Sequence, residues 1–217
     1  MKNLKVLFTV LCVACATAAW GAEECIYTCG FESSESFTAG TNYQNTVDQG
    51  PTGKQWKIYY GTTSTSSAIT GNQSLAMRLY TSSNYGYART MWKLSKVTKI
   101  SFKAKAGTSN NAAIKIDVHY SIDGSSWTAL KTSSTGTTDY TSQSVATTAT
   151  LYTAFMPSTI SGTTDVYLRI SINSGSTKPN SSNAQLTIDE VSVYGKSGST
   201  ETTVYSRRGR LRTRTAL

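Results

Sequence analysis

Lys99–Leu130 reads KISFKAKAGTSNNAAIKIDVHYSIDGSSWTAL, and this stretch decides the fold. Apolar and polar residues alternate along Ile100–Ala104 and again along Ile114–Tyr120. Because successive side chains of a strand point to opposite faces, a period of two with one apolar side predicts two half-buried strands. The glycine-, serine- and asparagine-rich connection between them predicts an antiparallel pair. Asp123-Gly124 then supplies a further turn.

The same alternation recurs at Leu75–Leu79 and Val166–Ile172, and a closing apolar run covers Leu186–Tyr194. The alternation of the closing run breaks at Asp189-Glu190, which predicts a β-bulge there. No long helical period occurs, and turn signals such as Gly50–Gly53 separate the short runs. The pattern predicts an all-β fold, an antiparallel jelly-roll β-sandwich.

Residues 1–21 have the layout of a secretory signal peptide: two lysines, the apolar run Val6–Ala16, then small residues. The apolar run is shorter than the ~20 residues that span a bilayer. Cys15 leaves a lipoprotein anchor as an alternative. We therefore expect an exported protein, secreted or held at the cell surface or in the periplasm, with a mature domain over residues 22–195 and no transmembrane segment.

The formal charge of +9 does not describe the predicted domain. The signal segment holds two lysines, and the tail, residues 196–217, holds six basic residues and one acidic one. The remaining 22–195 therefore keeps 13 of the 21 basic and 11 of the 12 acidic residues. A nearly neutral body argues against a nucleic-acid surface. The tail, with its basic run Arg207–Arg214 after a Ser/Gly-rich linker, is predicted to be disordered.

After removal of the signal segment only Cys25 and Cys29 remain, too few for a disulfide framework. Residues four apart on an extended strand lie roughly 13 Å from each other, too far to be bridged. A disulfide within a local loop and two buried free thiols both stay open. Neither alternative supplies the ligand count of a zinc site.

Several aromatic residues lie in turn-rich segments where their rings can be exposed. Sugars stack their C–H faces on such rings while polar neighbours bind the hydroxyls. The predicted ligand-binding residues are Trp56, Tyr59, Tyr60, Tyr85 and Tyr87. Core packing is the alternative for each ring, and Trp92 and Trp127 are assigned to the core. In an extended strand the adjacent Tyr59 and Tyr60 point to opposite faces, so at most one of them would face a ligand.

Catalytic patterns are missing from the sequence. The one histidine, His119, lies on the polar side of a predicted strand, where solvent exposure is the default. No G-x-S-x-G motif is present for a serine hydrolase, and Asp117 has no visible carboxylate partner for glycoside hydrolysis. No glycine-rich phosphate-binding loop occurs. We therefore expect a protein that binds rather than catalyses.

The order of short motifs adds a resemblance. The motifs are Phe31-Glu32, the aromatic run Trp56–Tyr60, LAMRL, KISFKAKA, YSIDGSSW, VYLRI and LTIDEVSVYG. Together, over roughly Phe31–Gly195, they resemble jelly-roll domains of secreted proteins from Gram-negative gut and oral bacteria. Such domains are similar to carbohydrate-binding modules, galactose-binding-like domains and MAM-like or "choice-of-anchor" domains. The resemblance implies a non-catalytic accessory module.

The resemblance also implies a structural Ca²⁺ between an early glutamate and a carboxylate of the last strand. Glu32 and Asp189 match these two positions, and Glu190 is a further candidate ligand. Carboxylates suit this ion, which takes six to eight oxygen ligands. The alternative is that these are solvated carboxylates at strand ends.

The expected function is that of a secreted binding module for a glycan or a cell-surface polymer. One alternative is a structural or adhesion module that binds another surface protein, which a flat exposed apolar patch would favour. A second alternative is the detached accessory domain of a larger secreted hydrolase or nuclease. VYSRRGRL at Val204–Leu211 is similar to the start of a type IX secretion sorting domain and is the basis of that alternative.

Overall fold

The computed structural model describes residues 22–40, 43–81, 84–107, 113–177 and 184–196, together with two short strands of the C-terminal segment. The larger compact unit of the chain spans Glu23–Ser197. The predicted signal peptide and most of the predicted basic tail lie outside the described residues. Within the described part of the chain, no helix has the length and apolar character needed to cross a membrane.

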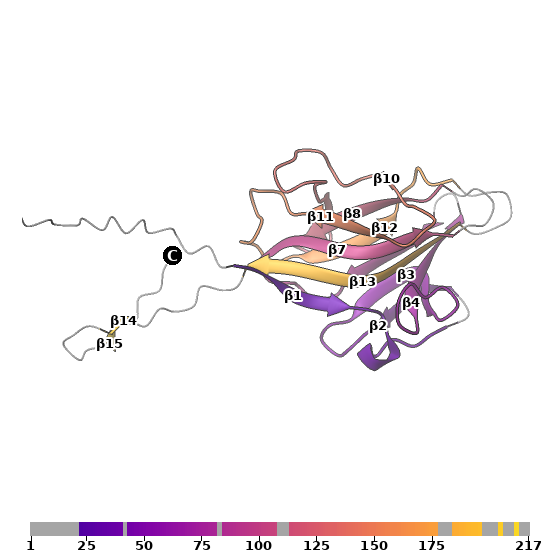
Figure 1. Cartoon of the computed structure of the whole chain (residues 1–217), viewed down its shortest axis with the longest axis horizontal. Coiled ribbons are helices and arrows are strands. Elements are labelled where there is room, and N and C mark those ends of the chain that lie inside the picture. Colours follow the sequence, from indigo (N-terminus) through magenta and orange to yellow (C-terminus); the bar gives the residue numbers. More distant parts are fainter. Residues whose placement is uncertain are drawn as a thin grey trace, which may run out of the picture. The chain divides into compact units, whose positions relative to one another are not determined.

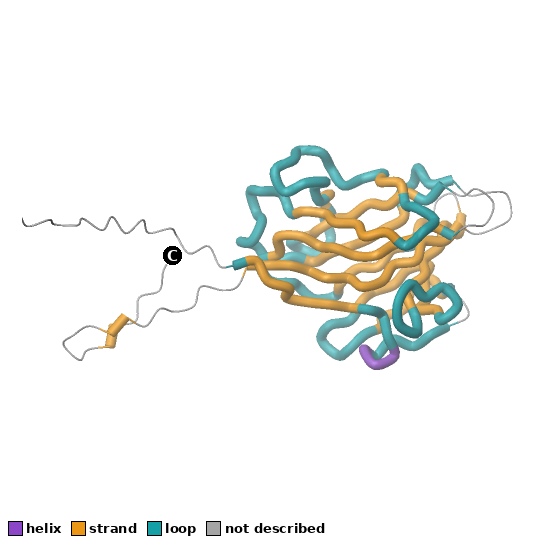
Figure 2. Tube along the Cα trace, viewed as in Figure 1, coloured by secondary structure: helices purple, strands orange, loops and turns teal. Residues whose placement is uncertain are grey.

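The described domain is built from strands joined by turns, with one short 3-10 helix, η1, at Ser33–Glu35 (Figures 1 and 2). The strands are β1 (Glu23–Cys29), β2 (Gln44–Gln49), β3 (Trp56–Ser64), β4 (Ser74–Thr81), β5 (Asn84–Tyr85), β6 (Tyr87–Thr90), β7 (Val97–Ala106), β8 (Lys115–Ser121), β9 (Thr128–Ala129), β10 (Gln143–Ser144), β11 (Thr150–Phe155), β12 (Tyr167–Ile172) and β13 (Ala184–Lys196). In the C-terminal segment β14 (Val204–Tyr205) pairs with β15 (Leu211–Arg212).

The strands follow one another in the order β10-β8-β12-β6-β3-β4-β13-β7-β11. All pairings between the named strands are antiparallel, and β1 joins along β13 while β2 joins along β3 (Figure 1). We call β8, β12, β6 and the first half of β3 the front layer. The back layer consists of the second half of β3 with β4, β13, β7 and β11. This confirms the predicted all-β jelly-roll sandwich.

The strands predicted around the Gly107 turn are present as β7 and β8, but the prediction that they pair with each other is wrong. β7 pairs with β13 and β11, whereas β8 pairs with β12, β10 and β9. The two strands therefore belong to opposite layers. Alternation shows that a strand has one buried face, and both layers of a sandwich bury one face, so the pattern does not reveal which layer a strand joins.

β3 connects the two layers. Its residues Trp56–Tyr59 pair with β6, and residues Gly61–Ser64 pair with β4. Between these halves Tyr60 has a φ of 45°, in the left-handed region that a tyrosine rarely occupies. A Cβ on the next residue, Gly61, would lie 2.8 Å from Ile58 Cγ2 and 3.0 Å from the Ala76 carbonyl oxygen. The corner therefore needs glycine because backbone and core side chains approach it closely.

The bulge predicted in β13 is confirmed. Its register against β7 shifts between Asp189 and Ser192, and Glu190 has a φ of 46°. The extra residue restores the apolar side to the core, so that Ile188 and Val191 are both fully buried. It also turns the Asp189 side chain into the protein, where only 1% of the residue is exposed.

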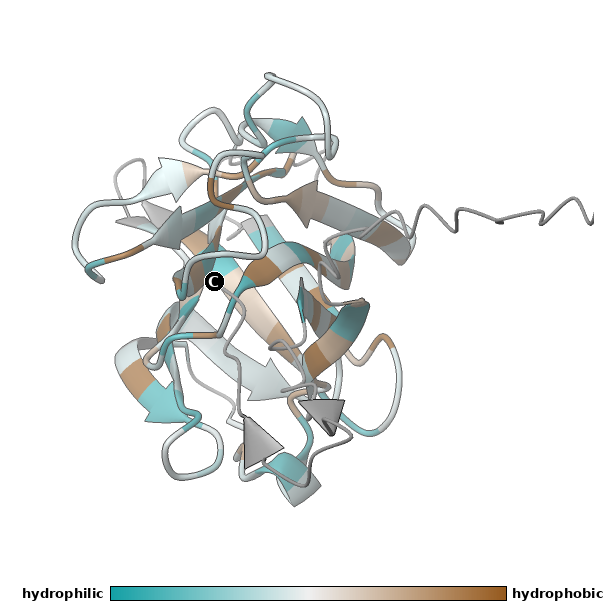
Figure 3. Cartoon of the chain, turned by 90° about the vertical axis from the view of Figure 1, so that its left-hand side faces the viewer, coloured by the Kyte–Doolittle hydropathy of each residue, from teal (hydrophilic) through white to brown (hydrophobic). Residues whose placement is uncertain are grey.

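The core lies between the two layers, and every second side chain of each long strand points into it. Along β7 from Thr98 to Ala106 the even-numbered residues are buried while the odd-numbered ones are partly exposed. In Figure 3 apolar and hydrophilic bands both occur along the strands, and most loops are of intermediate hydropathy. At one end an aromatic cluster fills the core with edge-to-face contacts, and its members are Tyr27, Phe31, Phe37, Trp56 and Trp92. Trp92 thus packs against the core as predicted.

The two cysteines of the domain are free thiols on β1. Cys25 is exposed and Cys29 is buried, so the alternative of two buried thiols holds for one of them only. Burial raises the pKa of the Cys29 thiol to about 12, which keeps it protonated and unreactive.

The β3 corner yields the first prediction. Gly61→Ala should lower the free energy of unfolding by about 1–3 kcal/mol, because the new methyl group has to displace Ile58 and the Ala76 carbonyl. Urea unfolding measures this change. Gly175→Ala is the matched control, since its Cβ would meet only the ends of the Asn173 and Lys115 side chains and no backbone. Equal stability of the two variants would contradict a tightly packed corner.

Candidate ligand-binding face

The outward side chains of the front layer form a continuous surface, which we call the front face. Inward residues such as Ile58, Ala88 and Ile170 are fully buried, and the outward residues between them are partly exposed. The strand register arranges the outward residues in two rows. One row is Lys57, Arg89, Arg169 and His119; the other is Tyr59, Tyr87, Ser171 and Asp117.

Tyr59 and Tyr87 form an aromatic platform in the second row. They are directly opposite each other on β3 and β6, with ring centroids 5.0 Å apart and planes inclined by 25°. Both rings are partly exposed. Cross-strand aromatic pairs stabilise a sheet, and a partly exposed pair also offers an apolar surface to a ligand.

Arg89 and Arg169 lie directly opposite each other in the first row. The guanidinium carbon of Arg169 is 4.6 Å from the centroid of the Trp127 ring, and that of Arg89 is 5.8 Å from it. Arg89 Nη1 also donates a hydrogen bond to the Gly124 carbonyl oxygen at 3.0 Å. The Nε atoms of both arginines are buried and have no hydrogen-bond partner. Each arginine therefore has a fixed guanidinium with an unused donor.

The loop that carries Trp127 is ordered by Asp123. Its Oδ1 accepts hydrogen bonds from the backbone N–H groups of Ser126 and Ser125, both at 2.7 Å, and from the Ser121 hydroxyl at 2.9 Å. These bonds hold the pKa of Asp123 well below its usual range. The predicted Asp123-Gly124 turn is therefore present, with Gly124 at a φ of 78°.

The assignment of Trp127 to the core is wrong. The residue is partly exposed and is absent from the buried cluster, because the Asp123 turn directs it back over the front face. Its ring lies against two guanidinium groups, a favourable cation–π arrangement. Sequence reasoning missed this residue, and also Arg89 and Arg169, although both arginines alternate with apolar residues in the sequence.

His119 is partly buried rather than exposed as expected. Its Nδ1 is buried and has no hydrogen-bond partner. Burial, together with the neighbouring Arg169 charge, lowers the pKa of His119, so the imidazole is neutral at pH 7. Asp117 lies on the same face, but its carboxylate accepts hydrogen bonds from Asn173 Nδ2 and the Ser142 N–H, each at 2.8 Å.

Two of the five aromatic residues predicted to bind a ligand are buried. Trp56 is fully buried in the aromatic cluster, where its Nε1 donates to the Tyr27 hydroxyl at 3.0 Å. Tyr60 is also buried, and Tyr85 packs against the core from β5. The burial of Trp56 and Tyr60 contradicts their placement on a ligand-facing surface, whereas Tyr85 is partly exposed and its role in ligand binding stays a prediction.

The strand is not extended at Tyr60, yet only one of the two adjacent tyrosines is available to a ligand as expected, since Tyr59 is partly exposed and Tyr60 is buried. Their ring centroids are 4.4 Å apart in an edge-to-face contact. The left-handed backbone at Tyr60 breaks the alternation of β3 at that residue. Of the predicted set, the structure stacks Tyr59 and Tyr87 on the front face.

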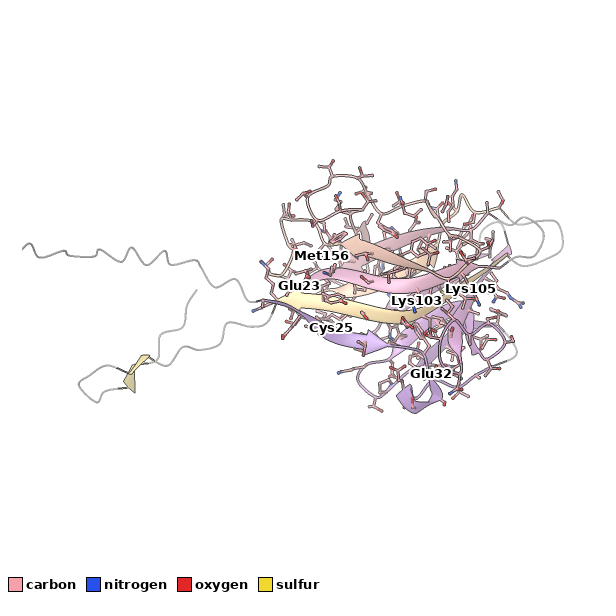
Figure 4. All side chains as sticks on the ribbon, in the orientation of Figure 1. Glu23, Cys25, Glu32, Lys103, Lys105 and Met156 are labelled. Atoms are coloured by element: carbon pink, nitrogen blue, oxygen red, sulfur yellow. The ribbon has the colours of Figure 1, made fainter. Side chains whose placement is uncertain are left out.

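The predicted metal ligands Glu32 and Asp189 both bind the loop before β4. Glu32 Oε1 accepts hydrogen bonds from the N–H groups of Asn72 at 2.9 Å and Gln73 at 3.4 Å. The side chains of Thr70 and Ser74 donate to Asp189 Oδ2 at 2.7 and 2.9 Å, and the N–H of Thr70 adds a third bond at 2.9 Å. Glu32 is labelled in Figure 4. The two carboxylates thus hold one loop from two sides.

Glu35 lies beside this pair, and its Oε2 accepts hydrogen bonds from the N–H groups of Gly30 and Glu32. A Cβ on Gly30 would come within 3.8 Å of atoms of Glu32, Glu35 and Asp189. Glu190, the third predicted ligand, instead forms an exposed ion pair of 2.8 Å with Lys103 of β7 (Figure 4). Across the described ranges no three acidic, histidine or cysteine side chains form a ready metal-binding group.

A separate hollow of about 380 Å³ lies over the back layer, beside the loop after β3. Its main side chains are Tyr43 and Arg78, whose guanidinium carbon is 3.5 Å from the Tyr43 ring centroid. The other lining residues are small and mostly hydroxyl-bearing, including Thr62, Ser64 and Ser67. Sequence reasoning did not single out this hollow.

No family model and no curated protein matches this sequence. Solved structures do resemble the chain. The CBM22-1 xylan-binding domain of Paenibacillus barcinonensis Xyn10C has a TM-score of 0.44 and 14% identity, over 82% of this chain and 99% of that one. The K2 cleaved adhesin domain of Lys-gingipain has a TM-score of 0.46 and 16% identity, over 79% and 97%. The structure of TmCBM61 in complex with β-1,4-galactotriose has a TM-score of 0.39 and 13% identity, over 65% and 88%. Two of these three solved structures are described as carbohydrate-binding and one as an adhesin domain.

The environment of His119 predicts a pH effect on stability. Because the folded state lowers the pKa of His119, the unfolded chain binds this proton more readily, so His119 contributes its full stability above its ordinary pKa of about 6.5. That contribution is lost as the pH falls below this value, at up to about 1.4 kcal/mol per pH unit. Arg169, Asp117 and Asp139 are the charged groups near the imidazole.

Urea unfolding of the wild type and of His119→Gln, at about pH 7.5 and about pH 5.5, measures this contribution. The wild type should lose more stability than the variant between the two conditions. Titration of the carboxylates is common to both proteins and cancels in the comparison. An equal loss of stability in the two proteins would show that the folded state does not lower the pKa of His119.

Proposed function

We propose that the chain is an exported, non-catalytic module that binds a glycan through its front face. The observation that supports this most directly is the pairing of the Tyr59–Tyr87 platform with a row of hydrogen-bonding side chains on the neighbouring positions. Small-ligand sites combine apolar and aromatic walls with a few placed polar groups. The proposed location, secreted or at the cell surface or in the periplasm, rests on the signal-peptide pattern of residues 1–21.

The dimensions of the front face favour an oligosaccharide over a single sugar. The two rows cross β3, β6, β12 and β8 in that order. Neighbouring strands lie about 4.8 Å apart, so each row is roughly 14 Å long. A chain of sugars lying across the strands would meet an aromatic platform at one end and Asp117, His119 and Asn173 at the other.

The alternative of a protein partner has less support from the described surface. The large apolar side chains that are exposed are Met91, Ile122 and Leu151, and they come from three separate segments of the chain. Binding sites for proteins are marked by contiguous apolar patches instead. The alternative of a detached accessory domain rests on Val204–Leu211 alone, whose side chains lie outside the described residues.

The second proposal is a Ca²⁺ at the Glu32–Asp189 site. Carboxylate oxygens of Glu35 and Asp189 lie within 3.8 Å of the position of a Cβ on Gly30, and the Glu32 carboxylate binds the neighbouring loop at Asn72; none of the three takes part in the ion pairs of the described residues. Such oxygens are the ligands that Ca²⁺ prefers. The ion would have to replace part of the N–H and hydroxyl bonds to Glu32 and Asp189, and its role would be to hold the loop before β4.

Glycan binding through the front face predicts that Tyr59→Ala and Tyr87→Ala each weaken binding by about tenfold or more, since an aromatic contact contributes on the order of 1 kcal/mol beyond its buried area. Affinity electrophoresis against a panel of neutral and acidic polysaccharides measures the effect. Tyr194→Ala is the matched control, because Tyr194 is a partly exposed tyrosine on β13 of the back layer. Equal loss in all three variants, or no binding to any polysaccharide, would refute the proposal.

The calcium proposal predicts a thermal shift. At a Ca²⁺ concentration 100 times its Kd, the wild type should gain about 2.7 kcal/mol of stability over the EDTA-treated protein. Asp189→Asn should remove this gain, whereas Glu190→Gln should keep it, because Glu190 is occupied by Lys103. Differential scanning calorimetry gives both values. A wild type that melts at the same temperature with Ca²⁺ and with EDTA would leave the carboxylates as a metal-free anchor for the loop.

A further inference from the structure

The arginine pair on the front face lowers the stability of the ligand-free folded protein. Arg89 and Arg169 are direct cross-strand neighbours, and like charges in this position destabilise a sheet. Neither arginine takes part in the ion pairs of the described residues, which join Lys57, Lys99, Lys103 and Lys131 to acidic partners. Burial lowers the pKa of Arg169 and the Arg89 charge acts in the same direction, while Tyr87 and Asp117 act against this shift without cancelling it. Two positive charges are thus held together without a counter-charge of their own.

The acidic groups of the front face are already engaged. The Asp117 carboxylate accepts hydrogen bonds from Asn173 and Ser142. Asp48, which pairs across β2 with Lys57, forms its ion pair with that lysine at 3.8 Å. The outward side chains of β2, β3, β6, β12 and β8 in the described residues include four basic groups, Lys57, Arg89, Lys115 and Arg169, against these two carboxylates. His119 between them is neutral at pH 7.

The arginines are also preorganised to bind an anion. Both guanidinium groups lie against the Trp127 ring, and that ring is held by the Asp123 turn. Each Nε is buried and makes no hydrogen bond, and Arg89 Nη1 is taken by the Gly124 carbonyl, so the guanidinium edge that carries Nε is the one with an unused donor. This edge of a guanidinium matches the two oxygens of a carboxylate or a sulfate group. The buried Nδ1 of His119, across from Arg169, adds a third unused polar atom.

We propose that the front face selects acidic glycans, with a carboxylate or sulfate group bound between Arg89 and Arg169 while a neighbouring sugar ring stacks on Tyr87. Tyr87 and Arg89 are two residues apart on β6 and point to the same side. Their Cα atoms therefore lie roughly 6.7 Å apart. An anionic substituent on a sugar and the ring beside it can thus contact the two rows at once. This inference rests on the proposed glycan-binding function and names its ligand class.

The test compares acidic polysaccharides with neutral counterparts of the same backbone. Isothermal titration calorimetry with the full chain would use polygalacturonate and alginate against their carboxyl-reduced forms, and dextran sulfate against dextran. We expect an acidic form to bind at least about tenfold more tightly than its neutral counterpart, because hydrogen bonds to charged groups are the strong ones. The carboxylate and sulfate arms identify which anion the arginine pair prefers.

Two arginine variants separate this site from general charge attraction. Arg89→Gln and Arg169→Gln should bind the acidic form no more tightly than the neutral one. Arg169→Lys, which keeps the charge but loses the two-point contact, should fall between the wild type and Arg169→Gln. Lys103→Gln is the matched control: it removes one positive charge from the back layer (Figure 4) and should retain the preference for acid.

The folded state of each variant is checked by its melting temperature. Removal of one of two opposed like charges should leave this temperature unchanged or raise it, so a structural role for the pair would appear as a clear drop instead. If such a drop occurs, Arg169→Lys is the variant used for the binding test.

Equal affinity for acidic and reduced forms would overturn the acidic-glycan inference while the proposed function stands. No binding to either form would overturn the proposed function itself, and equally tight binding of single-stranded DNA would reassign the arginine pair to polyanions in general.

Discussion

The bend of β3 at Tyr60-Gly61 is the constraint on which the two-layer arrangement depends. β3 pairs with β6 before the bend and with β4 after it, so this single strand fixes the position of β6 in one layer and of β4 in the other. The bend uses a tyrosine in the left-handed region, a conformation that costs about 1–3 kcal/mol, and it leaves no room for a side chain at Gly61. Such strain persists only where surrounding contacts stabilise it. Here the buried Ile58 and the backbone of β4 do so.

The same bend explains where the ligand-binding residues lie. Up to Tyr59 the alternation of β3 sends Trp56 and Ile58 into the core and Tyr59 outward to meet Tyr87. Register across β6 and β12 then places the arginines beside the tyrosines. A face that keeps two like charges together with buried unused donors is less stable than one with neutral polar residues. Proteins tolerate this kind of local cost mainly at functional sites, where activity requires it.

Most strands could be predicted from the sequence because each buries one face. The β13 bulge could be predicted because the apolar residues are even-numbered at Leu186 and Ile188 but odd-numbered at Val191. The partners of the strands could not, since β7 and β8 show the same alternation although they lie in opposite layers. The site was predicted in part: Tyr59 and Tyr87 are on the front face, whereas Trp56 is buried. Composition favours aromatic rings as ligand contacts, but burial of a given ring depends on tertiary packing that a single strand does not encode.

The Glu32–Asp189 site and the Arg89–Arg169 pair differ in how far hydrogen bonds within the protein already compensate their charged groups. At the Glu32–Asp189 site each carboxylate accepts hydrogen bonds from the loop before β4, so the free protein already compensates much of its negative charge. At the arginine pair the buried Nε donors have no partner, and the nearest acidic groups bind other residues. Unpaired buried polar groups are expensive, and of these two centres an anionic ligand removes that cost at the arginine pair, where two such donors lie together. The physical case for ligand binding is therefore stronger at Arg89 and Arg169 than at the carboxylates, although acidic residues were the more conspicuous signal in the sequence.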